Sequence, residues 1–246
     1  MIINIVSADK RYFFLNEMLN EKGYASKIVS PYENTKCNFL VLSVKNELSD
    51  EELISTLSYI DEKTVVLCGS DKRVSDFFSG KIINYANGED FLQANADLTA
   101  EATISYIHNE TLSSVENKKV FVSGYGRISK KLCRILKALG ALVYVFARRE
   151  SVQEQIVADG YTCASVSFCK NCDIIINTVP AVVFTNDIIS TIKSDAEIIE
   201  LASAPYGFEN MDRVKLASGL PGKILPLSAS KIIYDTIVPY LSGNDK

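Results

Sequence analysis

A glycine turn between a strand-like and a helix-like segment constrains the fold of this chain more than any other feature. Residues 120–122 form an apolar, β-rich run, and Gly124 and Gly126 follow shortly after it. Apolar side chains then recur at helical spacing as far as Gly140, and a second β-rich run occupies residues 142–146. Strand, turn, helix and strand in this order predict a βαβ unit, whose two strands are parallel neighbours in one sheet.

The same alternation of apolar runs and amphipathic stretches extends over the rest of the chain. It predicts an α/β protein with two three-layer domains. The expected strands are residues 2–6, 39–42, 64–67, 120–122, 142–146, 174–176 and 197–199, with one more at residues 224–225.

Helix signals complete this expected organisation. One helix should end at Gly23 and another should begin at Asp50, where acidic residues suit the helix dipole. A crossover helix is expected over residues 97–109 with Thr99 as its N-cap, and a last helix over residues 229–241. We therefore expect a first domain over residues 1–96, a second over 97–226, and a C-terminal helix in residues 227–246 that packs back toward the first.

Charge and hydropathy narrow the classes of partner. The 246 residues carry a formal net charge of −4 and 23% charged side chains, without the basic stripe that a nucleic-acid partner requires. No apolar run approaches the roughly 20 residues that span a bilayer, and the first residues lack the pattern of a signal peptide. We expect a cytoplasmic protein with no nucleic-acid or membrane partner.

Six dispersed cysteines are expected to be free thiols, because a chain of this size forms a core without disulfides. Cys169 and Cys172 have the spacing of a redox or metal site. However, no second pair exists, and the only histidine, His108, is distant in sequence. We interpret the pair as incidental and expect no metal.

The glycine turn itself indicates nucleotide binding of the Rossmann type. Gly124 permits a tight turn, and Gly126 removes a Cβ that would keep the backbone from a pyrophosphate on the helix N-terminus. The third glycine position of the motif holds Ser129 instead, so the motif is imperfect. The expected cofactor-binding residues of this turn are Gly124, Tyr125, Gly126, Arg127 and Ile128.

The end of the second strand favours NADP over NAD. An acidic residue that binds the ribose 2′-hydroxyl is usual there, but this chain has Ala147, Arg148 and Arg149. A guanidinium makes charge-assisted bonds to a 2′-phosphate, whereas an acid would repel it. Solvated charges at a strand end are the alternative interpretation of the two arginines.

Two further strand ends are expected to line the nicotinamide side, because ligands of open α/β folds bind at the carboxyl edge of the sheet. The first consists of Asn177, Thr178, Val179 and Pro180. The second contains Ser203, which follows the run at residues 197–199 among small residues that allow a ring to approach. Both segments could instead be ordinary turns.

Taken together in their order along the chain, these motifs resemble the dipicolinate synthase A-subunit family, bacterial enzymes that make pyridine-2,6-dicarboxylate for spores. The resemblance covers nearly the whole chain. It implies a flavodoxin-like N-terminal domain, a Rossmann domain that binds NADP, and a B subunit resembling a flavoprotein as partner. The matching stretches are residues 9–11, Asn95 with residues 99–101, 124–129, 147–148, 177–180, 201–205 and 220–223.

The resemblance also implies the reaction, oxidation of dihydrodipicolinate or its hydrated precursor to dipicolinate with hydride passed to NADP. Aromatisation removes a hydride and a proton, and the ring carboxylates need cations or donors. Glu101 is the candidate proton acceptor. In the alternative interpretation, Glu101 only stabilises its helix by interacting with the helix dipole. The substrate-binding candidates are Asp9, Arg11, Thr99, Lys223 and Ser228, the last in a segment where the family tends toward a lysine.

Three other functions stay open. Another NADP-dependent dehydrogenase of a small carboxylate is possible, although His108 is poorly placed to serve as the base of a hydroxyacid dehydrogenase. A nucleotide-binding subunit or sensor without turnover is the second, and a purely structural subunit is the third. A homodimer is compatible with all of them.

Overall fold

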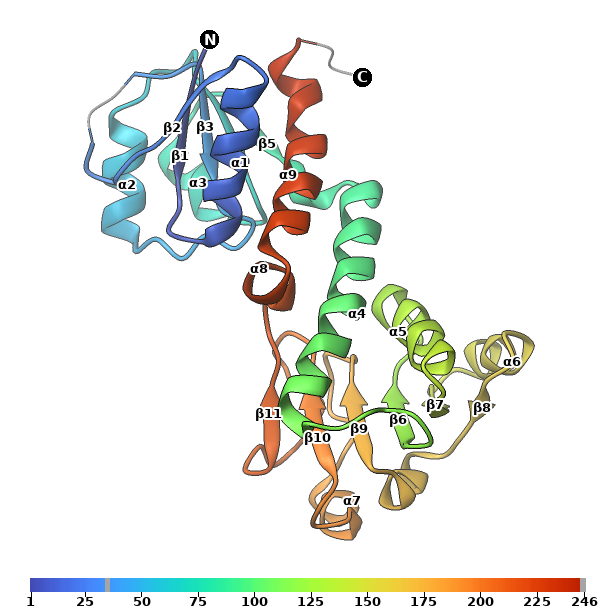
Figure 1. The fold of residues 1–246 in the computed structure, drawn as a ribbon. Coiled ribbons are helices and arrows are strands. Elements are labelled where there is room, and N and C mark those ends of the chain that lie inside the picture. The colour runs from blue at the N-terminus through green and yellow to red at the C-terminus, as the bar shows by residue number, and fades with distance from the viewer. Residues whose placement is uncertain (34–35, 244–246) are drawn as a thin grey trace. The chain divides into compact units, whose positions relative to one another are not determined.

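The computed structural model describes residues 1–33 and 36–243 of the chain (Figure 1). These residues divide into two compact units, each with its own parallel sheet. The first unit consists of Met1–Asn95 together with the residues from Pro221 onward, and the second is Ala96–Leu220. The predicted fold class, two α/β domains, is confirmed.

The first unit has a five-stranded parallel sheet in the order β2-β1-β3-β4-β5. This is the flavodoxin-like order, with its switch point between β1 and β3. The central strands β3 and β4 are continuous apolar segments because helices cover both faces of such a sheet. The strands are β1 (Ile2–Val6), β2 (Ala25–Ile28), β3 (Phe39–Leu42), β4 (Val65–Cys68) and β5 (Ile82–Asn84).

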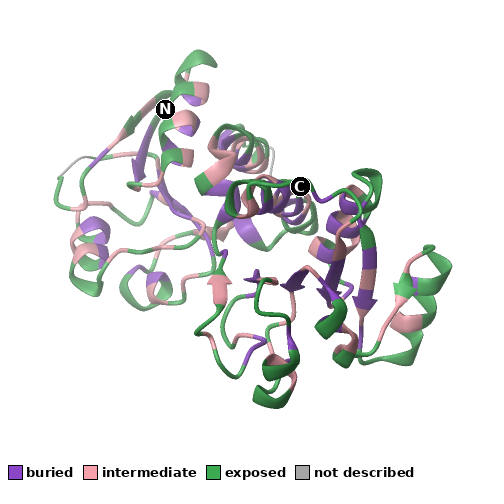
Figure 2. Cartoon of the chain, turned by 60° about the horizontal axis from the view of Figure 1, so that its bottom comes forward, coloured by how far each residue is buried: buried purple, intermediate pink, exposed green. Residues whose placement is uncertain are grey.

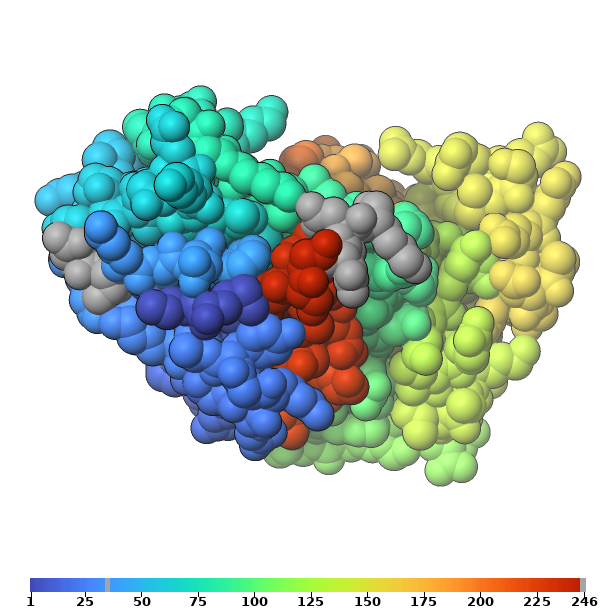
Figure 3. Space-filling view, turned by 90° about the horizontal axis from the view of Figure 1, so that it is seen from above, coloured from blue at the N-terminus to red at the C-terminus, as the bar shows by residue number. Residues whose placement is uncertain are grey.

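The helices of the first unit come from both ends of the chain. The C-terminal helix α9 packs against α1, and Figure 3 shows its residues in red beside the blue N-terminal residues. Ile233, Ile237 and Leu241 of α9 enter the same buried cluster as Ile3 and Tyr12. The helices are α1 (Lys10–Glu21), α2 (Asp50–Ser58), α3 (Arg73–Phe77), the 3-10 turn η1 (Tyr85–Asn87), α8 (Leu220–Ile224), which begins at the last residue of the second unit, and α9 (Pro226–Leu241).

The second unit has a six-stranded parallel sheet in the order β11-β10-β9-β6-β7-β8. Numbered from β6, this is the doubly wound dinucleotide-binding order, with its switch point between β6 and β9. The central strands are the most buried part of the unit, drawn in purple in Figure 2. The strands are β6 (Lys119–Ser123), β7 (Leu142–Phe146), β8 (Thr162–Cys163), β9 (Ile174–Asn177), β10 (Glu197–Glu200) and β11 (Val214–Leu216).

Its helices connect these strands. They are α4 (Glu89–Thr111), which starts in the first unit, α5 (Arg127–Ala138), α6 (Glu150–Ala158), the 3-10 segment η2 (Val166–Asn171) and α7 (Asn186–Thr191). Among the described residues, no helix is long and apolar enough to cross a membrane.

Three expectations about local structure differ from the structure. The crossover helix α4 begins at Glu89, so Thr99 lies in its interior and is not an N-cap. Residues 224–225 are not a strand, because α8 ends at Ile224 and the sixth strand is β11, which precedes it. The chain returns to the first unit at Pro221, earlier than the boundary expected after Pro226.

Candidate nucleotide site and its surroundings

The turn after β6 requires glycine at its first position. Gly124 has a φ of +95°, which L side chains rarely adopt, and its N–H donates to the carbonyl of Phe146 at 2.8 Å. A Cβ at this position would stand 2.5 Å from Thr178 Oγ1 and 2.8 Å from Val179 Cγ2. Both the backbone angle and the close approach of the β9 end therefore exclude a side chain here.

Gly126 meets a different requirement, because a Cβ added there would point into open space. No heavy atom lies within 4 Å of that Cβ position, and the φ of Gly126 is −90°. The residue is the N-cap of the 12-residue helix α5, and no side chain caps that helix. The exposed N-terminus of a helix, approached through a position without a Cβ, fits a pyrophosphate.

Ser129 occupies the position of the third motif glycine and is fully buried. Its Oγ lies 2.7 Å from Thr178 Oγ1, and that threonine hydroxyl donates to the carbonyl of Ser123 at 2.7 Å. Since the single proton of Thr178 goes to Ser123, Ser129 is the donor to Thr178. The serine therefore ties the start of α5 to the ends of β6 and β9 instead of merely being tolerated.

The side chain of Tyr125 makes its contacts within the protein. It is buried, and its hydroxyl donates to Asp159 Oδ2 at 2.7 Å. Tyr161 packs edge-on against its ring at 6.1 Å. Only the backbone of Tyr125 is therefore available to a nucleotide, whereas Arg127 is exposed and Ile128 half-buried at the start of α5.

The predicted NADP residues lie where β7 ends. Ala147 is buried, and its carbonyl accepts a hydrogen bond of 2.8 Å from Gln153 Nε2. Arg148 and Arg149 are exposed, and neither makes an ion pair within the described part of the chain. Two exposed arginines thus follow β7, the strand beside the one that leads into the glycine turn, and neither has an anionic partner among the described residues.

The ends of β9 and β10 are joined by a buried pair of polar side chains. Asn177 and Glu200 are each 0% exposed and lie side by side in the strand register. Asn177 Nδ2 donates to Glu200 Oε1 at 2.8 Å and to Oε2 at 3.0 Å. Asn177 was expected from the sequence but Glu200 was missed, since its only signal is an acid at the end of an apolar strand.

The rest of the predicted nicotinamide side lies at this same edge. Thr178 and Val179 are half-buried against Gly124, while Pro180 and Ser203 are exposed. Asn177 Oδ1 accepts from Val179 N at 3.2 Å, so the residue also shapes its own loop. The structure therefore brings the β6, β9 and β10 loops together around one hydrogen-bonded group.

In the first unit, two of the substrate candidates are partners of each other. Asp9 caps α1 by accepting from Arg11 N at 2.9 Å. The Arg11 guanidinium also holds the Asp9 carboxylate, through Nε at 3.0 Å and Nη2 at 2.6 Å. Burial raises the pKa of Asp9, but the hydrogen bonds from Arg11 outweigh that effect and lower the pKa below 3.8. Nη1 of Arg11 stays available for another anion.

Lys223 and Ser228 lie in the same unit and are exposed. Gly222, the neighbour of Lys223, lies directly against Arg11, because a Cβ there would stand 2.8 Å from Arg11 Nε. Ser230 donates its hydroxyl to the carbonyl of Arg11. The α8–α9 segment thus contacts Arg11 through Gly222 and Ser230, while Lys223 and Ser228 face solvent.

Two tyrosines that were not expected from the sequence lie beneath this edge of the first sheet. Tyr12 and Tyr85 are buried, with their hydroxyl oxygens 2.6 Å apart. Tyr85 donates to the carbonyl of Leu42 at 3.0 Å, and Tyr12 accepts from Val44 N at 2.6 Å. Burial raises the pKa of Tyr12 to about 12, so the pair stays protonated at neutral pH.

The remaining candidates are on α4 within the second unit. Glu101 is exposed, and Thr99 is half-buried with its carbonyl accepting from Thr103 Oγ1 at 2.7 Å. His108 is exposed near the end of the helix. The substrate candidates are therefore distributed over the two units.

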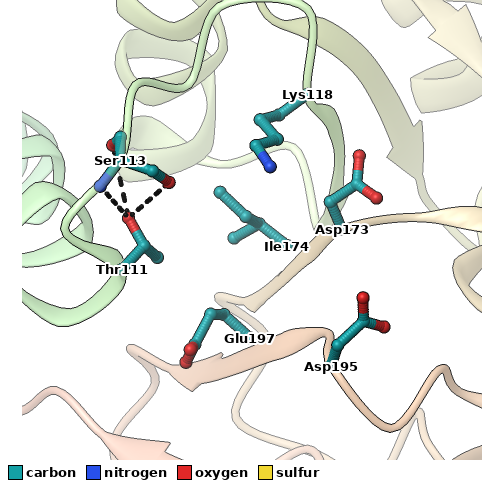
Figure 4. A pocket seen from close by; sticks show the side chains of 7 residues that line it. All are labelled: Thr111, Ser113, Lys118, Asp173, Ile174, Asp195 and Glu197. Atoms are coloured by element: carbon teal, nitrogen blue, oxygen red, sulfur yellow. Dashed lines mark hydrogen bonds between the residues drawn. The ribbon is translucent and has the colours of Figure 1, made fainter.

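A cavity of about 190 Å³ lies at the opposite, amino edge of the second sheet. Figure 4 shows Ile174 at its centre with the amino group of Lys118 pointing into it. Asp173 and Glu197 on its wall are already paired with Lys193 and Lys215. This cavity has no part in the nucleotide turn, which is at the other end of β6.

The two cysteines with the C-x-x-C spacing, Cys169 and Cys172, lie in the core of the second unit. Both thiols are buried in the apolar cluster around Phe121 and Phe184. Burial raises the pKa of Cys169 to about 11 and that of Cys172 to about 12. Among the described residues, no group of histidine, cysteine or acidic side chains is arranged to hold a metal.

Comparisons with known proteins agree with this geometry. Residues 87–203 match the family of the D-isomer specific 2-hydroxyacid dehydrogenase, NAD binding domain. The chain is 27% identical over 217 residues to the A subunit of dipicolinate synthase from Bacillus subtilis, covering 81% of this chain and 73% of that protein. The resemblance to the dipicolinate synthase A-subunit family is confirmed.

Solved structures show the same fold over the full length. The A subunit of dipicolinate synthase from Bacillus halodurans superposes with a TM-score of 0.79 at 22% identity, covering 98% of this chain and 97% of that one. A transhydrogenase from Sinorhizobium meliloti gives 0.74 at 14% identity, covering 99% and 94%. The family match and these relatives support a dehydrogenase-type oxidoreductase whose cofactor is a nicotinamide dinucleotide.

Proposed function

We propose, from the resemblance to the A subunit of dipicolinate synthase, that this chain oxidises dihydrodipicolinate or its hydrated precursor to dipicolinate with NADP. The proposal rests mainly on the carboxyl edge of the six-stranded sheet in the second unit. There an open glycine turn, an uncapped helix N-terminus and two unpaired arginines lie together. The relative from Bacillus subtilis supplies the substrate class.

The preference for NADP rests on Arg148 and Arg149. Both are exposed at the end of β7, where an acidic residue would bind the ribose of NAD. A 2′-phosphate offers these guanidinium groups the anion that the described part of the chain does not provide. The family description names NAD, so the choice of NADP comes from these two side chains.

In the proposed reaction, NADP would accept the hydride when bound. The Thr178–Pro180 loop and Ser203 border the nicotinamide ring. Glu101 takes the proton that leaves as the substrate becomes aromatic. Arg11, through Nη1, and Lys223 bind the ring carboxylates, and Asp9 keeps the Arg11 guanidinium in place. Thr99 and Ser228 complete the set of substrate contacts.

We also propose a second, B-type polypeptide as partner, because the relative in Bacillus subtilis is by name the A component of its enzyme. A location in the cytoplasm fits the cysteines, all six of which are free. A homodimer is compatible with both statements.

The test is binding of dipicolinate to the protein before and after saturation with NADP. The proposal predicts that dipicolinate binds only when the nucleotide is present, since the nicotinamide ring would form part of the surface that dipicolinate contacts. Substrate-dependent reduction of NADP, with addition of the B subunit where needed, then measures turnover. Dipicolinate binding that is absent under every condition would contradict the proposed substrate class.

A nucleotide-binding subunit without turnover is the second candidate. The pairing of Arg11 with Asp9 favours it, because Nε and Nη2 of the guanidinium already hold a carboxylate within the protein. This candidate predicts NADP binding with no reduction of NADP in the presence of substrate and B subunit.

A further inference from the structure

Glu200 is an acid in a place where acids are rarely found. It is the last residue of β10, its exposed fraction is 0%, and it makes no ion pair within the described residues. Its carboxyl oxygens accept from Ala202 N at 2.8 Å and from Gly207 N at 2.8 Å, besides the two contacts from Asn177. Burying a carboxyl group without a cation lowers the stability of the folded protein, so a specific role is expected for this residue.

The hydrogen bonds define the charge state of this group. Every neighbour is a donor, and both oxygens accept, so a carboxyl proton would have no acceptor. Burial raises the pKa of Glu200 above its ordinary value, and the bonds from these donors offset only part of that rise. The geometry is that of a carboxylate held by oriented N–H groups in the interior.

These bonds also fix a loop. Ala202 and Gly207 lie at the two ends of the segment that contains Ser203, and both donate to Glu200. Gly207 lacks a Cβ where one would stand 2.2 Å from Asn177 Nδ2, which lets the segment close over the pair. The shape of the Ser203 segment therefore depends on one carboxylate.

The location of the group relates it to the cofactor. The sheet order reverses between β6 and β9, and a dinucleotide lies across such a switch point at the carboxyl edge. The half of the sheet formed by β9, β10 and β11 then serves the nicotinamide end. Glu200 is the last residue of β10, so it lies at the edge on this half.

We propose that Glu200 is a positioning residue of the nicotinamide half-site, and that its buried charge favours the oxidised nucleotide over the reduced one. The oxidised nicotinamide ring carries a positive charge that is lost when a hydride is added. A fixed anion in a low-dielectric region stabilises only the cationic form. The inference rests on the proposed nucleotide site and adds a role for a residue outside the glycine motif.

The experiment compares dissociation constants of oxidised and reduced NADP by calorimetry for the wild-type chain and for Glu200→Gln. The proposal predicts that the variant binds the oxidised form more weakly relative to the reduced form, by roughly threefold or more. Glu116→Gln is the control, because Glu116 is exposed at the opposite edge of the same unit. An unchanged ratio of the two constants in Glu200→Gln would overturn the proposal.

Two further measurements separate charge from positioning and cover a variant that fails to fold. Glu200→Asp keeps the charge but shortens the side chain, so both constants should rise while their ratio stays within about twofold. In the wild type, the ratio should resist added salt, because a buried charge is little screened. A ratio that collapses in Glu200→Asp, or that disappears with salt, would contradict the role of the buried charge.

The outcomes also distinguish this inference from the proposed function. Failure of the wild-type chain to bind either form of the nucleotide would remove the proposed nucleotide site itself. Binding of both forms with no dependence on Glu200 would leave that site intact and refute the inference alone.

Discussion

The carboxyl edges of the two parallel sheets use their polar groups in opposite ways. In the first sheet, the edge between β1 and β3 is satisfied internally, since Asp9 holds Arg11 and Ser43 donates to Ser7 at 2.8 Å. In the second sheet, the edge between β6 and β9 leaves Gly126 facing open space and α5 without a capping side chain. Two doubly wound sheets, each with a switch point, thus have one closed edge and one open edge.

This difference shows that the architecture alone does not make a binding site. Both edges stand at a switch point where ligands of doubly wound sheets bind. The side chains decide whether the edge is already filled or ready for an anion. The predictions below change one edge at a time, beginning with the largest expected effect.

Gly124→Ala should damage the open edge most. The alanine would adopt a strained φ of +95° and would place Cβ 2.5 Å from Thr178 Oγ1. Strain and overpacking together should lower the free energy of unfolding by about 3 kcal/mol, measured by urea denaturation. Gly126→Ala is the matched control; because alanine is a poorer N-cap than glycine, it should cost up to about 1 kcal/mol. Equal stability of the two variants would refute this view of the turn.

Asp9→Asn tests the closed edge. Asparagine still caps α1, so the change removes mainly the charge that faces Arg11. We expect a loss of about 2 kcal/mol, because Arg11 is left half-buried without its anion. Glu33→Gln removes one partner of an exposed pair with Lys27 and should cost less than about 0.5 kcal/mol. A loss no larger than that of the control would show that the pair is not what closes this edge.

The same variant has a defined pH dependence. The pKa of Asp9 is lowered in the folded protein, so its contribution is present above pH 3.8 and is lost as the pH falls through the folded value. The stability difference between wild type and Asp9→Asn should therefore be constant near neutral pH and shrink in acid below about pH 4. A difference that grows in acid would contradict the assigned direction.

Arg148→Asp tests whether the open edge prefers NADP to NAD. An acid at this position accepts from a ribose hydroxyl and repels a 2′-phosphate, so the ratio of NADP to NAD affinity should fall tenfold or more, about 1.5 kcal/mol. Arg134→Asp on α5 changes the charge of the same unit by the same amount and should leave the ratio unaltered. Calorimetric titration with both nucleotides measures it. If Arg148→Asp leaves the ratio at the wild-type value, the cofactor argument is wrong.

Ser129→Ala should have the smallest effect, a loss of about 1 kcal/mol in the free energy of unfolding. The change removes a buried hydroxyl that donates to Thr178, but it leaves the bond from Thr178 to Ser123. Ser167→Ala removes an exposed hydroxyl from its contact with Ser165 and serves as the control. Identical thermal transitions for the two variants would mean that Ser129 merely fits its position.

The sequence predicted most of the fold because buried parallel strands are continuous apolar runs. Residues 2–6, 39–42 and 142–146 are strands with the expected bounds. Strands at the edges of the sheets gave weaker signals, and β8 contains only two residues. Its pairing with β7 comes from the fold, not from a local pattern.

The site was harder to predict for a physical reason. The glycine turn and the arginines act through local sequence, so their positions could be inferred from spacing alone. Glu200 acquires its role from Asn177 on β9 and from the backbone of Gly207, which are brought to it only by folding. An acid at the end of an apolar strand is its only signal in the sequence, and that signal does not reveal its partners.

The most direct measurement is a calorimetric titration of the purified wild-type chain with NADP and with NAD. The open edge and its two arginines predict saturable binding of NADP, at least about tenfold tighter than NAD. Absence of binding by either nucleotide, or tighter binding of NAD, would contradict the assignment of this edge as an NADP site.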